Sequence, residues 1–124
     1  MKKKAFLLKD ASPKKHLYFV ITDPDQDNRV LIVNITSCKR KIHYNNICIL
    51  LAKENHHSFI TKDSFVHYRK AQEINFLMFL KLQKENKLIL KNDISNKLLL
   101  IIQDGAKNKK SDLPSKFKKY FDFF

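Results

Sequence analysis

Basic, imidazole and hydroxyl side chains stand at the ends of two apolar runs near the start of the chain. Residues 14–40 read "KKHLYFVITDPDQDNRVLIVNITSCKR", and seven polar residues flank the two runs: Lys14, Lys15, His16, Thr36, Ser37, Lys39 and Arg40. Lysine and arginine attract phosphate, while hydroxyl and imidazole groups stabilise developing charge or move a proton. If the two ends meet in space, they form a phosphate site. Charged residues also occur at solvated strand ends, so a purely structural role stays open.

A second polar segment lies at residues 54–70, "ENHHSFITKDSFVHYRK". Histidine donates or accepts a proton near neutral pH, and it also satisfies backbone groups in loops. Neighbouring histidines in a loop, such as His56 and His57, rarely point the same way, which disfavours a metal site. The chain has a single glycine, which excludes a glycine-rich phosphate loop, and it has no CxxC pair. We therefore predict neither a metal nor a cofactor.

The chain carries 25 Lys and Arg against 12 Asp and Glu, a formal net charge of +13. Such a charge attracts polyanions and speeds their association. RNA, DNA, an acidic protein and an anionic membrane surface are all suitable partners. A chain rich in Lys, Asn and Ile is also what an AT-rich genome encodes, so the charge alone does not choose among them.

Cysteine usage and the short apolar stretches indicate the compartment. Cys38 and Cys48 lie in no metal motif, and a reduced location is the default for such a chain. The start "MKKKAFLLKD" begins like a signal peptide, but its apolar stretch Ala5–Leu8 is too short for one. Other apolar stretches, such as "INFLMFL", are too short to span a membrane. We expect a cytoplasmic protein with no membrane partner.

Runs rich in aromatic and β-branched residues predict the strands that position these side chains. They cover residues 17–22, 29–37, 46–52 and 64–74, with a short edge strand at Ala5–Leu8. The segment "DPDQDN" separates the first two long runs as a turn. Along the second run, Leu31, Val33 and Ile35 share the face that best suits a core, and polar residues share the other.

After residue 75, leucine, lysine, glutamine and glutamate replace the β-branched residues. Residues 76–90 suit either a helix or a strand with helical pieces. Residues 94–104 predict a helix capped by Asp93 and followed by Gly105. A last short helix carries an aromatic stripe: Phe117, Tyr120, Phe121 and Phe124. The lysines around this stripe either stay in water while the helix docks on the sheet or contact nucleic acid.

Strands followed by helices indicate an α+β fold with a small, mostly antiparallel, barrel-like sheet. We expect a single domain over residues 1–124. The β-barrel is predicted at about residues 14–74, and the C-terminal part, about residues 76–124, is predicted to be mainly helical.

Three segments of residues 14–74 resemble the barrel of MazF/PemK-type toxins. In that family a basic residue precedes a strand, and "KKHLYFVIT" is the similar stretch here. A later strand of the family ends in two hydroxyl residues, as "VNITS" does. The stretch "KDSFVHYRKAQEI" is similar to a further segment of the family. The resemblance implies an SH3-like antiparallel β-barrel and a metal-independent endoribonuclease that cuts single-stranded RNA. It also implies a homodimer and an acidic antitoxin protein as partners.

The resemblance and the polar clusters together assign two groups of residues. Catalytic roles fall to Lys15, His16, Thr36 and Ser37. Contacts to RNA fall to Lys14, Lys39, Arg40, His57, Tyr68 and Arg69. Lysine stands where the family has a catalytic arginine, and lysine cannot hold phosphate with two parallel bonds. His16 stands where the family has proline, and its imidazole offers the missing proton transfer. The alternative function is a non-catalytic basic interaction module that binds nucleic acid or an acidic protein.

Overall fold

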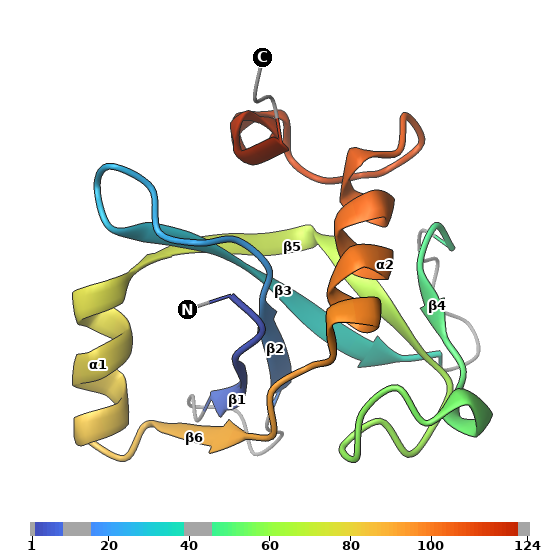
Figure 1. The fold of residues 1–124 in the computed structure, drawn as a ribbon, viewed down its shortest axis with the longest axis horizontal. Helices are drawn as coiled ribbons and strands as arrows, with labels where there is room; N and C mark the ends of the chain where they lie inside the picture. Colours follow the sequence, from blue (N-terminus) through green and yellow to red (C-terminus); the bar gives the residue numbers. More distant parts are fainter. Residues whose placement is uncertain (1, 9–15, 39–45, 122–124) are drawn as a thin grey trace.

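The apolar runs of the sequence form the strands of one antiparallel sheet (Figure 1). The computed structural model describes residues 2–8, 16–38 and 46–121. Its strands are β1 (Ala5–Leu8), β2 (His16–Val20), β3 (Arg29–Ser37), β4 (Ile49–Leu50), β5 (Ser64–Asn75) and β6 (Leu88–Lys91). They lie in the order β4-β5-β3-β2-β1-β6, with β4 and β6 at the edges. The α+β prediction is confirmed, whereas the predicted closure of the sheet into a barrel is not.

Two α-helices and two short 3-10 helices accompany the sheet in the described part of the chain: α1 (Phe76–Lys84), α2 (Asn96–Lys107), η1 (Ala52–Glu54) and η2 (Ser115–Phe121). α2 and η2 pack on one face of the sheet, and α1 packs on the opposite face at the far end of the molecule (Figure 1). None of these helices is long and apolar enough to cross a membrane.

Both faces of the sheet are buried along β3, because its residues 30–35 are all buried although they alternate between the two faces. Leu31, Val33 and Ile35 belong to the core on the α2 side, as predicted. Val30 and Ile32 point the other way and belong to a second core on the α1 side. Below, the two faces are called the α2 side and the α1 side.

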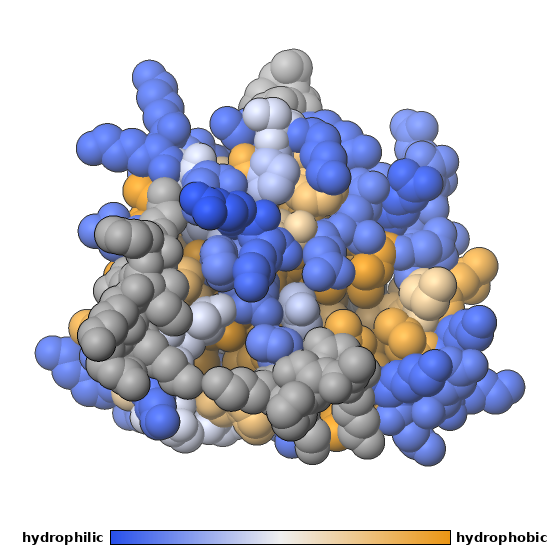
Figure 2. All heavy atoms as spheres, turned by 180° about the vertical axis from the view of Figure 1, so that it is seen from behind, coloured by the Kyte–Doolittle hydropathy of each residue, from blue (hydrophilic) through white to orange (hydrophobic). Residues whose placement is uncertain are grey.

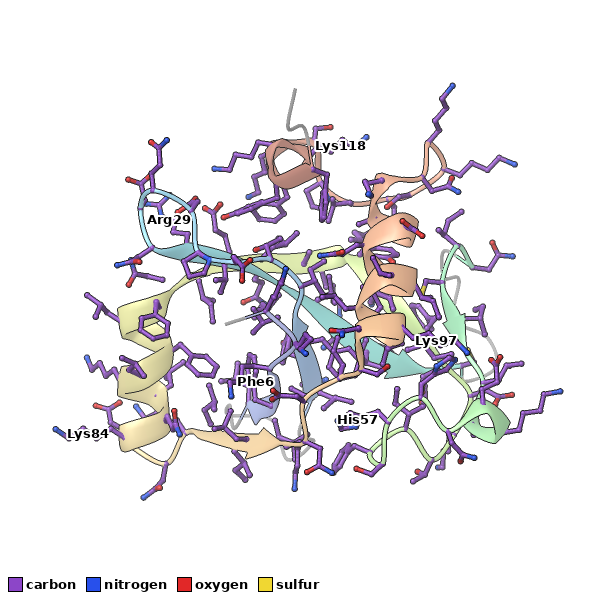
Figure 3. The ribbon with its side chains drawn as sticks, viewed as in Figure 1. Phe6, Arg29, His57, Lys84, Lys97 and Lys118 are labelled. Atoms are coloured by element: carbon purple, nitrogen blue, oxygen red, sulfur yellow. The ribbon has the colours of Figure 1, made fainter. Side chains whose placement is uncertain are left out.

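The helix α1 meets the sheet through Phe79, whose ring approaches that of Phe6 edge-on at 5.4 Å between centroids (Figure 3). The outward side of α1 leaves Leu77, Met78 and Leu80 between 44% and 66% exposed. Figure 2, which has α1 on its right, shows apolar side chains reaching the surface there among hydrophilic ones. The described part of the chain therefore leaves this side of α1 uncovered.

The start of α2 differs from the prediction. Ser95 caps the helix, because its hydroxyl accepts a hydrogen bond of 3.0 Å from the amide of Leu98. Asp93, the predicted cap, lies 3.7 Å from the ammonium of Lys4 instead. Serine and aspartate are similarly good caps, so the residue pattern does not distinguish them.

The end of α2 also differs, because the helix continues past Gly105 to Lys107. Gly105 is therefore an interior residue of the helix and not the residue after its end. A Cβ atom at this position would lie 2.2 Å from the hydroxyl oxygen of Tyr68. Close packing on Tyr68, and not helix termination, accounts for the single glycine of the chain.

Three further elements differ in length from the prediction. Predicted strand 46–52 is reduced to the two residues of β4, followed by η1. The ambiguous stretch 76–90 divides into α1 and β6. The last predicted helix is η2, whose aromatic residues are buried on the α2 side: Phe117, Tyr120 and Phe121. The lysines around them are exposed, as expected for a docked helix, and Phe124 lies outside the described residues.

Candidate functional site

The strand register brings the ends of β2 and β3 together. Leu17 pairs with Ile35 in this register. The printed pairing ends there, and continuing its register by one position places His16 of β2 opposite Thr36 of β3 at one end of the sheet. Directly opposite residues of antiparallel strands have Cα atoms about 4.5–5.5 Å apart, and their side chains share a face. An imidazole and a hydroxyl group are therefore neighbours at this end.

Thr36 and Ser37 point to opposite faces of the sheet, because neighbouring residues of a strand alternate. The hydroxyl of Thr36 lies on the α1 side, where it donates a hydrogen bond of 2.6 Å to Oδ1 of Asn34. Ser37 lies on the α2 side, where it lines a pocket of about 160 Å³ together with Leu17 and Ile35. The expected hydroxyl pair is thus divided between two surfaces.

Two further polar residues stand next to His16 and Thr36 on the α1 side. Asn34 is buried, and His67 of β5 lies opposite it in the register. An asparagine inside the apolar run "RVLIVNITS" is a sequence signal for a polar site, whereas His67 becomes a neighbour only through the pairing of β3 with β5. These four residues, His16, Asn34, Thr36 and His67, are called the polar row below.

The electrostatic surroundings of His67 favour its neutral form. Burial lowers the pKa of the imidazole below its ordinary value of 6.5. The charge of Lys70 lowers this pKa further, Asp112 opposes the shift, and Arg69 adds to it. The ring of Phe65 lies 5.3 Å away between centroids. A neutral imidazole at pH 7 accepts a proton, so His67 suits the role of a general base.

Four of the predicted catalytic and RNA-binding residues lie outside the described residues: Lys14, Lys15, Lys39 and Arg40. In the sequence, Lys15 directly precedes His16, and Lys39 directly follows Cys38. Each of these two lysines is therefore bonded to a residue at the same end of the sheet. Their contacts with phosphate stay predictions.

His57 has a structural role in place of the expected contact with RNA. Its side chain is buried, in the loop between η1 and β5 (Figure 3). Nδ1 accepts a hydrogen bond of 3.0 Å from the amide of Phe59, and Nε2 lies 2.6 Å from the carbonyl oxygen of Asn92. Since Nδ1 is an acceptor, Nε2 carries the hydrogen that it donates to Asn92. Both ring nitrogens are thus occupied within the protein.

Tyr68, predicted to contact RNA, is also buried. Its side chain has no exposed surface, and its hydroxyl donates a hydrogen bond of 2.7 Å to the carbonyl oxygen of Ile102 in α2. Burial raises the pKa of this phenol far above its ordinary value. Arg69, the next residue, is exposed and lies 3.8 Å from a carboxylate oxygen of Asp112. Of the two, Arg69 alone is accessible to a polyanion.

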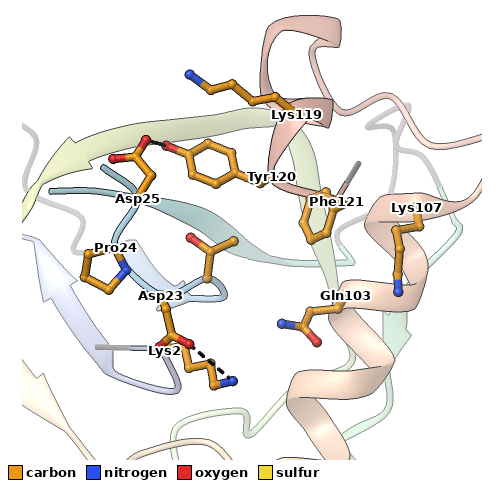
Figure 4. A pocket seen from close by; sticks show the side chains of 10 residues that line it. Lys2, Asp23, Pro24, Asp25, Gln103, Lys107, Lys119, Tyr120 and Phe121 are labelled. Carbon is orange, nitrogen blue, oxygen red and sulfur yellow. Dashed lines mark hydrogen bonds and ion pairs between the residues drawn. The ribbon is translucent and has the colours of Figure 1, made fainter. Parts of the chain in front are cut away.

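A larger cavity of about 410 Å³ lies on the α2 side, between the β2–β3 turn, α2 and η2 (Figure 4). Its charged lining residues carry both signs: Lys2, Asp23, Asp25, Lys107 and Lys119. The Lys2 ammonium lies 3.4 Å from the Asp23 carboxylate, and Lys119 lies 3.3 Å from Glu73. Because its cations face carboxylates, this cavity has less attraction for a polyanion than the total charge of the chain suggests.

The described ranges contain no group of three or more His, Cys, Asp and Glu side chains arranged to hold a metal ion. His56 and His57 contact different partners, since His56 lies 3.4 Å from the carboxylate of Glu54. The two adjacent imidazoles therefore serve separate structural contacts.

No model of a protein family, no characterised protein and no solved structure matches the chain. The resemblance to MazF/PemK-type toxins therefore rests on the three sequence segments alone. The function of the chain has to be inferred from its own fold, charge and polar row.

Proposed function

We propose that the chain is a toxin-type endoribonuclease that cleaves single-stranded RNA without a metal, at the sheet end that carries the polar row. The observation that supports this most is the pairing of β2 with β3, whose register, continued by one position beyond Leu17 and Ile35, places His16 opposite Thr36. A formal net charge of +13 supplies the attraction for a polyanion.

A positioned base is sufficient for RNA to be cleaved by its own ribose. His16 accepts the proton of a ribose 2′-OH, and the 2′ oxygen attacks the adjacent phosphorus. The bond between phosphorus and the 5′ oxygen breaks, and the leaving oxygen takes a proton from water. The products are a 2′,3′-cyclic phosphate and a 5′-hydroxyl. The charge of Lys15 stabilises the negative charge that develops on the phosphate.

Thr36 acts in this scheme through its oxygen. It donates its own hydrogen to Asn34, so the lone pairs of its oxygen are left to accept. In the proposed scheme that oxygen accepts a hydrogen bond from the N–H of His16, which leaves the other ring nitrogen to take the proton of the ribose 2′-OH. Asn34 is a positioning residue, because it fixes the Thr36 hydroxyl and does not touch RNA. His67 adds a neutral imidazole to the same row.

The remaining parts of the proposal come from the toxin resemblance and the charge. A closed SH3-like barrel, a homodimer, an acidic antitoxin and a cytoplasmic location stay predictions. The physical reason to expect an acidic partner is long-range attraction, which a net charge of +13 makes strong at low salt.

The test is incubation of the purified chain with end-labelled single-stranded RNA in EDTA, followed by identification of the product ends. We expect cyclic phosphate ends and a rate that falls by about 100-fold or more in His16→Ala. The matched control is His56→Ala, because His56 contacts Glu54 in the loop after η1. The control should cleave at the rate of the unmodified chain. Cleavage that His16→Ala leaves intact would remove the assigned role.

The second candidate is the basic interaction module, and the exposed lysines around η2 favour it. They surround a buried aromatic stripe and lie in water: Lys107, Lys109, Lys110, Lys116, Lys118 and Lys119. If this surface carries the function, replacing Lys116 and Lys118 by glutamate weakens binding of RNA or an acidic protein. His16→Ala would then leave binding unchanged, and no cleavage would be seen.

A further inference from the structure

A phenylalanine in the loop between η1 and β5 is presented to solvent. Phe59 is 44% exposed, although the next residue, Ile60, is buried in the core on the α2 side. A single exposed aromatic ring is ordinary on a protein surface. Whether this ring can bind a ligand depends on how rigidly its backbone is held and on which side chains lie around it.

The backbone that carries Phe59 is held by the buried imidazole of His57. That imidazole accepts a hydrogen bond from the amide of Phe59. Its other ring nitrogen is hydrogen-bonded to the carbonyl oxygen of Asn92, which follows β6. The amide of Ile60 donates a hydrogen bond of 3.0 Å to the carbonyl oxygen of His57. The exposed ring therefore stands on a turn with two internal hydrogen bonds and a third to Asn92, so the backbone loses little conformational freedom when a ligand covers the ring.

Phe59 also lines the pocket of about 160 Å³ that contains Ser37. The other polar residues of its lining are Thr61, Lys62 and Ser64. Ser64 donates its hydroxyl hydrogen to the carbonyl oxygen of Lys62 at 2.9 Å, so the hydroxyls of Ser37 and Thr61 and the ammonium of Lys62 are the donors that this lining offers to a ligand. A pocket of this size is too small for a whole nucleotide but large enough for a phosphate group.

Two lysines accompany the ring. The ammonium nitrogen of Lys91 lies over one face of the Phe59 ring, 5.2 Å from its centroid, so a base has to stack on the opposite face. Lys62 is exposed at the pocket. Asp63, the acidic residue that follows Lys62 in the sequence, accepts a hydrogen bond of 2.8 Å from the amide of Ala52. Proteins hold single-stranded nucleic acid with aromatic rings that stack on bases and nearby cations that contact the phosphates.

We propose that Phe59 is a stacking platform for one base of single-stranded RNA, with the neighbouring phosphate held by Lys62 and the hydroxyls of Ser37 and Thr61. The proposal rests on the RNA binding proposed above, but it does not need cleavage. Ser37 of the pocket and Thr36 of the polar row are consecutive residues on opposite sides of one sheet end. One RNA strand that crosses this end reaches both sites.

Stacking on Phe59 determines which nucleic acids the site accepts. Every base has a flat face, so the platform tolerates all four bases. A base in a duplex is already stacked and is not free to cover the ring. The site therefore selects single-stranded over double-stranded RNA and adds little sequence preference.

The chain has no tryptophan, so Phe59→Trp introduces a single fluorescent reporter at the platform. We expect its emission to be quenched when a single-stranded oligoadenylate is added to the full chain. The matched control is Leu100→Trp, because Leu100 is 59% exposed on α2. Its emission should stay unchanged at oligonucleotide concentrations that saturate the first variant.

Removal of the ring tests the contribution of stacking to affinity. Phe59→Ala should weaken binding of the oligoadenylate by about 5- to 140-fold, which corresponds to the loss of one stacked base. Leu100→Ala should bind like the unmodified chain. Thermal unfolding of both variants confirms that the fold is retained.

The outcomes separate this inference from the proposed function. Oligoadenylate binding with no quenching of Phe59→Trp and no loss in Phe59→Ala would overturn the platform and leave the proposed function standing. Absence of binding by the unmodified chain would overturn both. Equal losses of single-stranded and duplex binding in Phe59→Ala would contradict base stacking as the reason.

Discussion

The hydroxyl oxygen of Tyr68 occupies the space that a side chain at Gly105 would need. A Cβ at Gly105 would come within 2.2 Å of that oxygen and 3.1 Å of the ring carbon that bears it. The same hydroxyl donates a hydrogen bond to the carbonyl oxygen of Ile102, one turn earlier in α2. This contact joins β5 to α2 and so links the sheet to the helix above it.

Gly105→Ala is therefore predicted to destabilise the chain. Alanine favours a helix over glycine by about 1 kcal/mol, but overpacking of a buried contact costs about 1–3 kcal/mol. Because Tyr68 is fully buried, we expect the clash to exceed the gain in helix propensity. Urea unfolding should show a lower midpoint for Gly105→Ala, and a higher midpoint would contradict the packing argument.

The double variant Tyr68→Phe with Gly105→Ala identifies the clashing atom. Tyr68→Phe alone removes one buried hydrogen bond, at a cost of about 1 kcal/mol. It also removes the oxygen that the new methyl group would meet. The double variant should be more stable than the sum of the two single effects predicts. Strict additivity would show that the hydroxyl is not the obstacle.

Glu73 gives the chain a stability that depends on pH. The hydrogen bond from Tyr120 holds the pKa of the Glu73 carboxyl below its ordinary value of 4.5, burial opposes the shift, and Lys119 and Arg29 support it. A carboxyl with a lowered folded-state pKa stabilises the fold above the unfolded-state pKa. We expect the free energy of unfolding to fall as pH drops below about 4.5.

The variant Glu73→Gln tests this assignment, because it removes the titrating group and keeps the shape. Its stability should depend less on pH in the acidic range than that of the unmodified chain. The pKa of Asp25 is also lowered, chiefly by its hydrogen bond from the Arg29 amide, so part of the dependence should remain. If the stability of Glu73→Gln falls at acidic pH as much as that of the unmodified chain, the assignment to Glu73 is refuted.

Protonation of His67 should cause a second loss of stability, at a higher pH than the loss caused by protonation of Glu73. Its folded-state pKa is below its ordinary value of 6.5, so the unfolded chain takes up the proton first. Stability should therefore decrease as pH falls from about 6.5 through the folded-state pKa. Titration of the imidazole by NMR should give a midpoint below 6.5. In His67→Gln, the free energy of unfolding should depend less on pH in this range. A midpoint at or above 6.5 would contradict the effect of burial.

His57→Ala should loosen the loop that carries Phe59. The change leaves the Phe59 amide and the Asn92 carbonyl without their partner, at a cost of about 1–3 kcal/mol. Hydrogen exchange at the Phe59 amide should accelerate, whereas His56→Ala should leave it slow. Equal protection in both variants would show that another group holds the turn.

Continuous runs allowed parts of the fold to be predicted from the sequence. The bounds of β3 agree with the prediction because nine residues without glycine or proline alternate between two buried faces. The N-terminal strand β1 is confirmed over its predicted residues, but it lies between β2 and β6 and is not an edge strand. The stretch 76–90 stayed ambiguous because its leucines suit α1 and β6 equally, and only the pairing of β6 with β1 separates them.

The site was only partly predictable, because its contacts join distant residues. The neighbours His16 and Thr36 follow from the hairpin of β2 and β3, which a turn signal between two runs already suggests. The burial of His57 depends on Asn92, 35 residues away in the chain. The burial of Tyr68 depends on α2, and no pattern near Tyr68 reveals that contact.

The measurement that tests the central claim most directly compares RNA cleavage by Thr36→Val and Ser37→Ala, two changes at consecutive residues. Each removes one hydroxyl, but Thr36 lies on the α1 side with the polar row, and Ser37 lines the pocket on the α2 side. With single-stranded RNA in EDTA at saturating concentration, the account predicts slow cleavage by Thr36→Val. Ser37→Ala, which removes only a phosphate contact in the pocket, should keep the full rate at saturation. Equal rates in the two variants, or no cleavage by the unmodified chain, would contradict it.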